Sequence, residues 1–291
     1  MYIKAALEGK NGMLRSLMLI ALLIVGFIIG QIPLIYFIDT ASSAESHNMG
    51  EILLLILLLL GYVGGLSVLL LFYGKIHKRS IRTLISGDSS ISVARILWAF
   101  FFWFGLLLIA EAILYFVDPA NYILQFEGIT FLILLVVSLI LIPIQTSFEE
   151  LIFRGYFIQQ FSLLFNSRIA GIALSAVIFG FMHMANPEVE AFGMSRMLFY
   201  YISFGLFAGI CTVIDGRLEL VLGIHAATNI YGATMVTFES SVLQTPAIFK
   251  IMNLDVPAMF LVFAASSIIF FYLAGRKYHW FSKSAFIDRI Q

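Results

Sequence analysis

Two adjacent carboxylates and an arginine, Glu149, Glu150 and Arg154, interrupt an otherwise apolar part of the chain. Charged side chains are costly at membrane depth, so such a cluster in a hydrophobic sequence predicts a functional site. On a helix, Glu150 and Arg154 are one turn apart and can form an ion pair that neutralises both charges. Glu149 points about 100° away and lacks that partner, which suits it to act as a general base in a cavity. The alternative is that both glutamates share Arg154 as a structural clamp.

Two histidines, His183 and His225, also lie within apolar segments, and Asn229 follows His225 by one helical turn. His225 and Asn229 therefore project from one face of a helix. A lone intramembrane histidine can simply bond to a neighbouring helix, but together with the glutamates these residues favour a single site. The other histidines fall in predicted loops or at a helix end, where we expect them to be solvated: His47, His77 and His279.

The positions along the chain are compatible with such a site. If a hairpin turns near Asn166, Glu149 lies 17 residues before the turn and His183 lies 17 residues after it. Both are then roughly 25 Å from the turn, at 1.5 Å of rise per residue. From a second turn at Gly216, His225 is only 9 residues further on, which is about 14 Å of helix. These depths do not match, unless the turn around residues 159–168 lies partly in the membrane interface and so brings Glu149 and His183 closer to the surface.

These residue types point to hydrolysis without a covalent nucleophile. A carboxylate near a histidine can hold and deprotonate a water molecule, and a second histidine with an amide can stabilise an oxyanion. The alternative is Zn²⁺ bound by Glu149, His183 and His225, with water in the open position. No His-Glu-x-x-His element is present and Asn229 is a poor zinc ligand, so we expect no cofactor. A Gly-x-Ser-x-Gly nucleophile elbow is also absent from the sequence.

The composition is that of an all-α integral membrane protein. Of the 291 residues, 61% are hydrophobic and only 12% are charged, and the mean hydropathy is +1.01. Basic and acidic residues balance at 17 each, which argues against a nucleic-acid partner. The single cysteine, Cys211, excludes an internal disulfide framework. The first apolar segment is too long for a signal-peptide core, so we expect a retained anchor, although residues 41–44 resemble a cleavage site.

About 20 apolar helical residues cross a bilayer, and eight segments qualify. We expect Pro143 to kink the fourth segment or to end its first part. Glu111, in the third segment, is expected to make a structural polar contact more readily than to join the cavity. The segments are Ser16–Ile38, Ile52–Tyr73, Ala94–Val117, Gly128–Phe165, Ile169–Met184, Met197–Ile214, Leu218–Phe238 and Pro257–Gly275.

Basic residues gather in alternate connections between these segments, as the positive-inside rule requires, and place both termini in the cytoplasm. The other connections are mainly acidic, with Arg196 and Lys250 among their few bases. No organellar targeting sequence is evident, which favours a bacterial inner membrane. The basic connections carry Lys4, Lys10, Arg15, Lys75, Lys78, Arg79, Arg82, Arg168, Arg217, Arg276, Lys277 and Lys283.

The three motifs resemble those of the CAAX-protease and bacteriocin-processing family of intramembrane proteases. This family is also called CPBP or Abi, and it includes the Ras-converting CAAX endopeptidase. Its motifs are Glu-Glu-x-x-x-Arg, Phe-x-x-x-His and His-x-x-x-Asn in successive membrane segments. In this chain they stand in that order as Glu149-Glu150-Leu151-Ile152-Phe153-Arg154, Phe179-Gly180-Phe181-Met182-His183 and His225-Ala226-Ala227-Thr228-Asn229.

The resemblance implies that Glu149 and His183 activate water, while His225 and Asn229 form an oxyanion hole. It also implies a supporting role for Glu150, Arg154 and Phe179. We expect an N-terminal part (1–127, three helices), a catalytic core (128–238, four helices), and a final helix with a cytoplasmic tail (239–291).

The predicted function is an intramembrane endopeptidase acting on a prenylated, lipid-linked or leader-peptide substrate in or at the lipid bilayer. The alternative is a non-proteolytic membrane protein, either a bacteriocin-immunity protein or scaffold, or a proton-coupled transporter.

Overall fold

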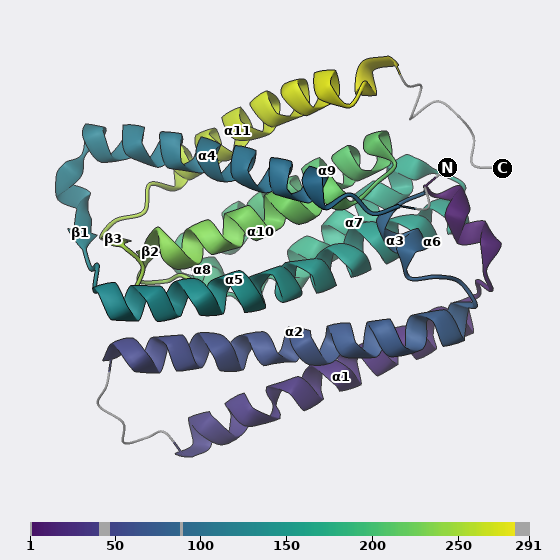
Figure 1. Ribbon diagram of the computed structural model, residues 1–291, viewed down its shortest axis with the longest axis horizontal. Helices are drawn as coiled ribbons and strands as arrows, with labels where there is room; N and C mark the ends of the chain where they lie inside the picture. The colour runs from purple at the N-terminus through teal and green to yellow at the C-terminus, as the bar shows by residue number, and fades with distance from the viewer. Residues whose placement is uncertain (1, 41–46, 88–89, 283–291) are drawn as a thin grey trace.

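Apolar helices dominate the computed structural model, which describes residues 2–40, 47–87 and 90–282 (Figure 1). In chain order the elements are η1 (Lys4–Glu8), α1 (Met13–Thr40), α2 (His47–His77), α3 (Arg82–Ile85), α4 (Val93–Val117), η2 (Pro119–Asn121), β1 (Tyr122–Leu124), α5 (Gly128–Glu150), η3 (Leu151–Phe157), α6 (Ile158–Leu164), α7 (Arg168–Met182), α8 (Pro187–Phe192), α9 (Met194–Asp215), α10 (Glu219–Thr234), β2 (Val236–Phe238), β3 (Phe249–Ile251), α11 (Val256–Lys277) and η4 (Trp280–Ser282).

Each predicted apolar segment coincides with a helix, and the all-α multi-pass class is confirmed. The count of eight crossings is not confirmed. Among the described residues six helices are long and apolar enough to cross a membrane, whereas α7 has 15 residues and α10 has 16. Both fall below the roughly 20 residues that a crossing needs. The six are Met13–Phe37, Gly50–His77, Val93–Val117, Gly128–Leu164, Met194–Asp215 and Val256–Lys277.

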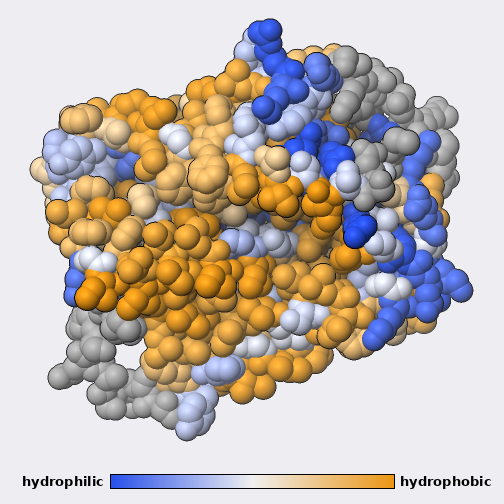
Figure 2. Space-filling view, viewed as in Figure 1, coloured by the Kyte–Doolittle hydropathy of each residue, from blue (hydrophilic) through white to orange (hydrophobic). Residues whose placement is uncertain are grey.

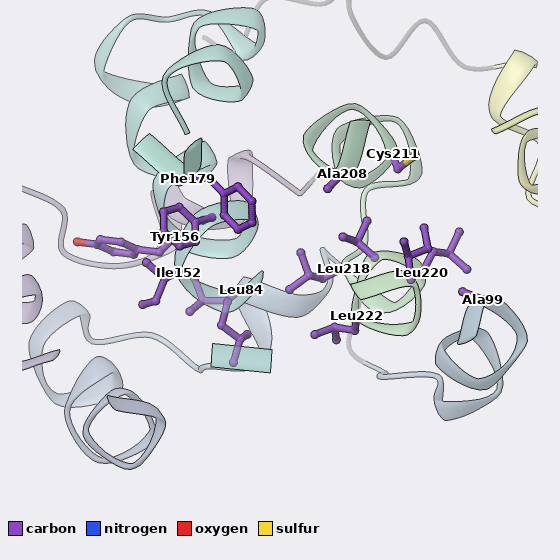
Figure 3. Packing of buried hydrophobic residues seen from close by; sticks show 14 of the residues in the cluster. Leu84, Ala99, Ile152, Tyr156, Phe179, Ala208, Cys211, Leu218, Leu220 and Leu222 are labelled. Atoms are coloured by element: carbon purple, nitrogen blue, oxygen red, sulfur yellow. The ribbon is translucent and has the colours of Figure 1, made fainter. Parts of the chain in front are cut away.

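Helix α10 is the central element of the bundle and packs against both α4 and α5. Figure 3 shows Leu218, at the start of α10, directed toward Ala208 of α9, and Leu220 of α10 directed toward Ala99 of α4. Its apolar residues are therefore covered by protein. The outer surface is different: Figure 2 shows an apolar band across the bundle, with hydrophilic residues gathered at the end that carries α3. An apolar band of this kind is the surface that a multi-pass membrane protein presents to lipid.

A small sheet at the opposite end of the bundle was not predicted. Its strand order is β1-β3-β2, with β1 antiparallel and β2 parallel to β3. The seventh segment was expected to be helical to Phe238, but α10 ends at Thr234. The returning chain bonds there, because Ile248 N–H donates to the Thr234 carbonyl and Phe249 N–H to the Met235 carbonyl. Tertiary pairing thus replaces the last helical turn.

Pro143 lies inside α5 and does not end it. The helix continues past Glu150 into η3, a π-helical segment, and then into α6, so that Gly128–Leu164 forms one long helical element. Segments of π-helix are rare and frequently mark functional sites.

The expectation for His77 was wrong. Its side chain is fully buried, with Nδ1 3.0 Å from the Lys10 carbonyl and Nε2 3.1 Å from the Tyr156 hydroxyl. The segment that precedes α1 folds back over the end of α2 and excludes water from this histidine. His279 is exposed as expected, and the side chain of His47 lies outside the described residues.

Glycines allow α1 and α2 to approach closely. A Cβ added to Gly64 would lie 2.2 Å from the Gly26 carbonyl oxygen, whereas one added to Gly105 of α4 would meet no atom within 4 Å. We expect Gly64→Ala to destabilise the protein by about 1–3 kcal/mol through overpacking. Gly105→Ala should be neutral or stabilising by up to about 1 kcal/mol through helix propensity. Thermal unfolding in detergent compares the two; equal melting temperatures would contradict this packing.

Candidate active site

The three motifs lie on three packed helical elements. The glutamates end α5 and Arg154 lies in η3, Phe179 lies on α7, and His225 lies on α10. The turn predicted near Asn166 is present, with a positive φ at that residue, and Ser167 caps α7 by accepting a hydrogen bond from Ala170 N–H. The hairpin therefore forms where the sequence predicted it.

The sequence predicted that His225 lies nearer the surface than Glu149. The structure brings the two residues together because α10 starts inside the protein. Leu218 and Glu219 are fully buried, and Leu218 N–H donates to the Ile85 carbonyl of α3. The start of α10 thus lies below the surface of the bundle. Glu149 and His225 come into contact as a result, with 3.6 Å between Oε2 and Nε2.

Glu150 is held by two partners. Its Oε1 accepts hydrogen bonds from Arg154 Nη1 at 2.8 Å and from His225 Nδ1 at 2.6 Å, and its side chain is fully buried. The Arg154 guanidinium in turn lies 4.2 Å from the Phe179 ring centroid, a cation–π contact. The predicted ion pair is present. We call Glu149, Glu150, Arg154 and His225 the Glu–Arg–His centre.

Glu149 is the less constrained carboxylate. Its Oε1 accepts a long hydrogen bond from Gln145 Nε2 at 3.4 Å, and Oε2 is buried with no hydrogen-bond partner among the described residues. Arg154 pairs with Glu150 and forms no ion pair with Glu149 in the described part of the chain, so the arrangement is not the shared clamp. A buried polar atom without a partner is where a water molecule binds.

The formal charges of Glu149, Glu150 and Arg154 do not cancel, and one additional proton would neutralise the Glu–Arg–His centre. Two carboxylates and one guanidinium sum to a single negative charge, which is costly to bury. Because His225 Nδ1–H donates to Glu150, Nε2 faces a carboxylate oxygen of Glu149, and these two atoms attract only if a proton lies on one of them. His225 Nε2 and Glu149 Oε2 therefore face each other as a possible acid–base pair.

His183 lies at the edge of the centre. Its ring stacks between Phe179, at 4.3 Å, and Tyr201, at 4.4 Å, and Nδ1–H donates to the Phe179 carbonyl at 2.7 Å. This hydrogen bond leaves Nε2 as the acceptor nitrogen. His183 forms no ion pair with either glutamate in the described structure. Asn229 joins the centre through Gln145, at 3.5 Å.

The site opens on the side of His183 and Asn229. These two side chains are partly exposed, whereas the four residues of the Glu–Arg–His centre are at most 5% exposed. The helix break predicted at Asn186-Pro187 occurs here, since α7 ends at Met182 and Pro187 begins α8. Next to it, Glu188 accepts a hydrogen bond from Val242 N–H at 2.7 Å, and burial raises the pKa of its carboxyl.

Hydrogen bonds from distant parts of the chain hold the π-helical segment in place. Ser175 Oγ donates to the Phe153 carbonyl at 2.6 Å, and the Tyr2 hydroxyl donates to the carbonyls of Leu84, at 2.7 Å, and Arg154, at 3.2 Å. Widening a helix from α to π shifts its carbonyls away from their usual partners. Ser175 of α7 and Tyr2, which precedes η1, donate hydrogen bonds to two of these carbonyls, those of Phe153 and Arg154.

The sequence did not predict two residues beside Glu149. Gln145 precedes it by one helical turn, so its polar side chain on the same face was a usable signal. Tyr62 of α2 was not predictable, because no motif includes it. Its hydroxyl lies near the side chains of Gln145 and Glu149, and its ring packs against Phe148 at 6.1 Å.

We expect Tyr62→Phe to lower kcat/KM for the activity of this site about tenfold, because a hydroxyl beside the Glu149 carboxylate can donate a hydrogen bond to it during the reaction. Tyr73→Phe, in the same helix, removes only a contact to Thr83 and is the matched control. Steady-state kinetics of both variants measure the effect. Equal losses in the two would show that the Tyr62 hydroxyl has no specific role.

Glu111 does not belong to the site. It accepts hydrogen bonds from the hydroxyls of Tyr122, at 2.5 Å, and Tyr231, at 2.8 Å. The structural polar contact expected for this carboxylate is therefore present.

The residues do not fit a zinc ion in this arrangement. No group of three His, Cys, Asp or Glu side chains among the described residues is placed to hold a metal. Glu149 and His225 offer two donors, but Arg154 adds a buried positive charge beside them, and among the described residues His183 forms no ion pair with Glu149.

The fold and the site define a multi-pass helical membrane protein with a buried Glu–Arg–His centre. Residues 128–231, which contain all three motifs, match the family model described as Rce1-like, type II CAAX prenyl endopeptidase. This part of the chain is similar to that family, and the resemblance predicted from the motifs is confirmed. The match supports a CAAX-type membrane protease in general terms.

A curated relative is similar to this chain over 178 residues. YyaK of Bacillus subtilis (strain 168), an uncharacterised protein, is 35% identical over 178 residues, which cover 60% of this chain. The chain spans 59% of that protein's length. No solved structure matches the chain.

Proposed function

We propose that this protein is an intramembrane endopeptidase that hydrolyses a peptide bond of a membrane-associated substrate with water activated by Glu149. The observation that carries the proposal is Oε2 of Glu149, which has no hydrogen-bond partner in the described part of the chain, lies 3.6 Å from His225 Nε2, and sits beside a glutamate already held by Arg154. The Rce1-like match supports the same class of reaction. The expected substrates are prenylated, lipid-linked or leader peptides.

In the proposed reaction Glu149 Oε2 takes a proton from a water molecule, and the resulting hydroxide attacks the carbonyl carbon of the peptide. His183 Nε2 accepts a hydrogen bond from the same water and orients it. The developing oxyanion accepts hydrogen bonds from the Asn229 amide and from protonated His225 Nε2. When the carbon–nitrogen bond breaks, Glu149 returns its proton to the leaving amine. No residue becomes covalently attached to the substrate.

The proposed orientation follows from charge. Basic residues concentrate at the end of the bundle that carries η1, α3 and the C-terminal end of α11 (Figure 1). The positive-inside rule assigns that end to the cytoplasm. We propose a bacterial cell membrane, with both termini cytoplasmic. Labelling of single cysteines introduced at Lys4 and Glu190 from either side of the membrane tests this orientation.

The experiment for the function uses purified protein in nanodiscs and a library of quenched fluorescent peptides, with and without a farnesyl group near the C-terminus. We expect cleavage at a defined bond, identified by mass spectrometry of both products. If no peptide product forms but proton flux into liposomes depends on Glu149, the protein is a transporter and the proposal is wrong.

A further inference from the structure

Helix α10 lies at the centre of the bundle, yet one of its faces is uncovered. All of its residues are buried except Thr228, Asn229 and Gly232, which are partly exposed. Thr228 is directed at α4, where its hydroxyl accepts a hydrogen bond from Trp103 Nε1 at 2.9 Å. Asn229 and Gly232 follow His225 by four and seven residues, so the three lie along one face of the helix. We call Asn229 and Gly232 the open face of α10.

The space beside Gly232 is free. A Cβ added there would meet no atom of another element within 4 Å among the described residues. Gly223, on the same helix, differs, because a Cβ there would lie 2.3 Å from the Ile96 carbonyl oxygen of α4. A glycine inside a helix is less favourable than an alanine. The approach of α4 explains the glycine at position 223, whereas packing gives no reason for the glycine at position 232.

The open face is uncovered because α7 ends beside His225. Helices α7 and α10 both run from the end of the bundle that carries α3 toward the small sheet (Figure 1). The ring of Phe179 lies 6.2 Å from that of His225, and α7 ends one turn after Phe179. Asn186-Pro187 then leads the chain into α8. No further turn of α7 covers Asn229 and Gly232.

Polar groups border this space. The Asn229 amide donates to Gln145 Oε1 at 3.5 Å, and the partly exposed His183 lies at the end of α7. At membrane depth such residues face the interior of a bundle or a water-filled space and not lipid. Gly232 lies about 4.5 Å beyond Asn229 along the helix axis, and one residue of an extended peptide spans about 3.3 Å. A peptide whose carbonyl is at Asn229 therefore places a neighbouring residue beside Gly232.

We propose that Gly232 is a specificity-determining residue: the space left by its missing Cβ receives a bulky apolar side chain of the substrate residue next to the scissile bond. Gly232 offers no polar group to that side chain. Met235, three residues further on, is partly buried and apolar as well. The inference rests on the proposed function for the reaction, but the accessibility of the space can be tested without cleavage.

The specificity test uses a peptide that the library shows to be cleaved, remade with alanine, leucine or phenylalanine on either side of the cleaved bond. We expect Gly232→Ala to lower kcat/KM for the leucine and phenylalanine peptides about tenfold relative to the alanine peptide, because the added methyl group overpacks the bound side chain. Its melting temperature should not fall, since the methyl group meets no other element. Gly105→Ala, which also adds a methyl group in open space, is the matched control and should keep the wild-type preference. An unchanged preference in Gly232→Ala, or an equal loss for all three peptides, would overturn the inference.

The accessibility test uses a trimethylammonium methanethiosulfonate, a thiol reagent whose permanent charge excludes it from hydrocarbon. In nanodiscs Gly232→Cys should react about 10²-fold faster than Gly105→Cys at the middle of α4. The wild type should stay unlabelled, because its single cysteine, Cys211, is 1% exposed. No reaction at Gly232→Cys would show that lipid fills the space, and this result would overturn the inference.

A protection experiment separates binding from cleavage. In the Glu149→Gln background, peptides of the library with a bulky apolar residue should slow the labelling of Gly232→Cys about tenfold. Slowed labelling without any cleavage by the wild type would refute the proposed function and leave the substrate contact at Gly232 standing. Labelling that no peptide slows would overturn the inference, even if the wild type cleaves peptides.

Discussion

Replacing Glu149 with glutamine is expected to lower kcat/KM for peptide hydrolysis by about 10³-fold, within the range of general-base catalysis. Glutamine keeps the shape of the side chain and can still bond to Gln145, but it cannot take a proton from water. The loss should appear in kcat, because the proton is transferred only in the transition state. Steady-state kinetics on a cleaved peptide measure it.

The fold should tolerate this change. Glu149 has an unpartnered oxygen, and no ion pair holds it to Arg154 in the described structure. The melting temperature of Glu149→Gln should therefore stay close to that of the wild type. A variant that is both inactive and unfolded would indicate a structural role for Glu149 instead.

Replacing Arg154 with leucine is expected to destabilise the protein by about 3–5 kcal/mol, because Glu150 would remain buried with its charge uncompensated. Arg154 is 1% exposed and packs against the Phe179 ring, and Glu150 is fully buried. Thermal unfolding in detergent measures the loss. Arg276→Leu removes an exposed arginine that bonds only to Tyr272 among the described residues and should change little.

The double variant Glu150→Gln with Arg154→Leu separates charge from packing. Removing both charges should recover much of the stability that Arg154→Leu loses, since no unpaired buried charge is left. Activity should stay low in the double variant, because His225 loses the carboxylate that orients it. A double variant less stable than Arg154→Leu would contradict this account of the pair.

The sequence predicted those features of the site that depend on local spacing. The ion pair between Glu150 and Arg154 follows from their separation of one helical turn, and the hairpin at Asn166 follows from the lengths of two apolar segments. The three motifs also predicted the family. Each of these signals lies within a single element or a single turn.

Contacts made between distant parts of the chain were not predictable. The bond between His225 and Glu150 joins residues 75 apart and depends on α10 starting below the surface, at Leu218. The π-helical segment depends in part on Tyr2, and the burial of His77 depends on the segment before α1. In each case tertiary packing decides a feature that the local sequence leaves open.

In the proposed mechanism Glu149 activates water without a metal. Its most direct test is cleavage of one identified peptide by wild-type protein and by Glu149→Gln, each with and without a strong chelator. We predict that the wild type stays active in the chelator and that Glu149→Gln is inactive in both conditions. Full activity of Glu149→Gln, or wild-type activity that the chelator abolishes and zinc restores, would contradict the claim.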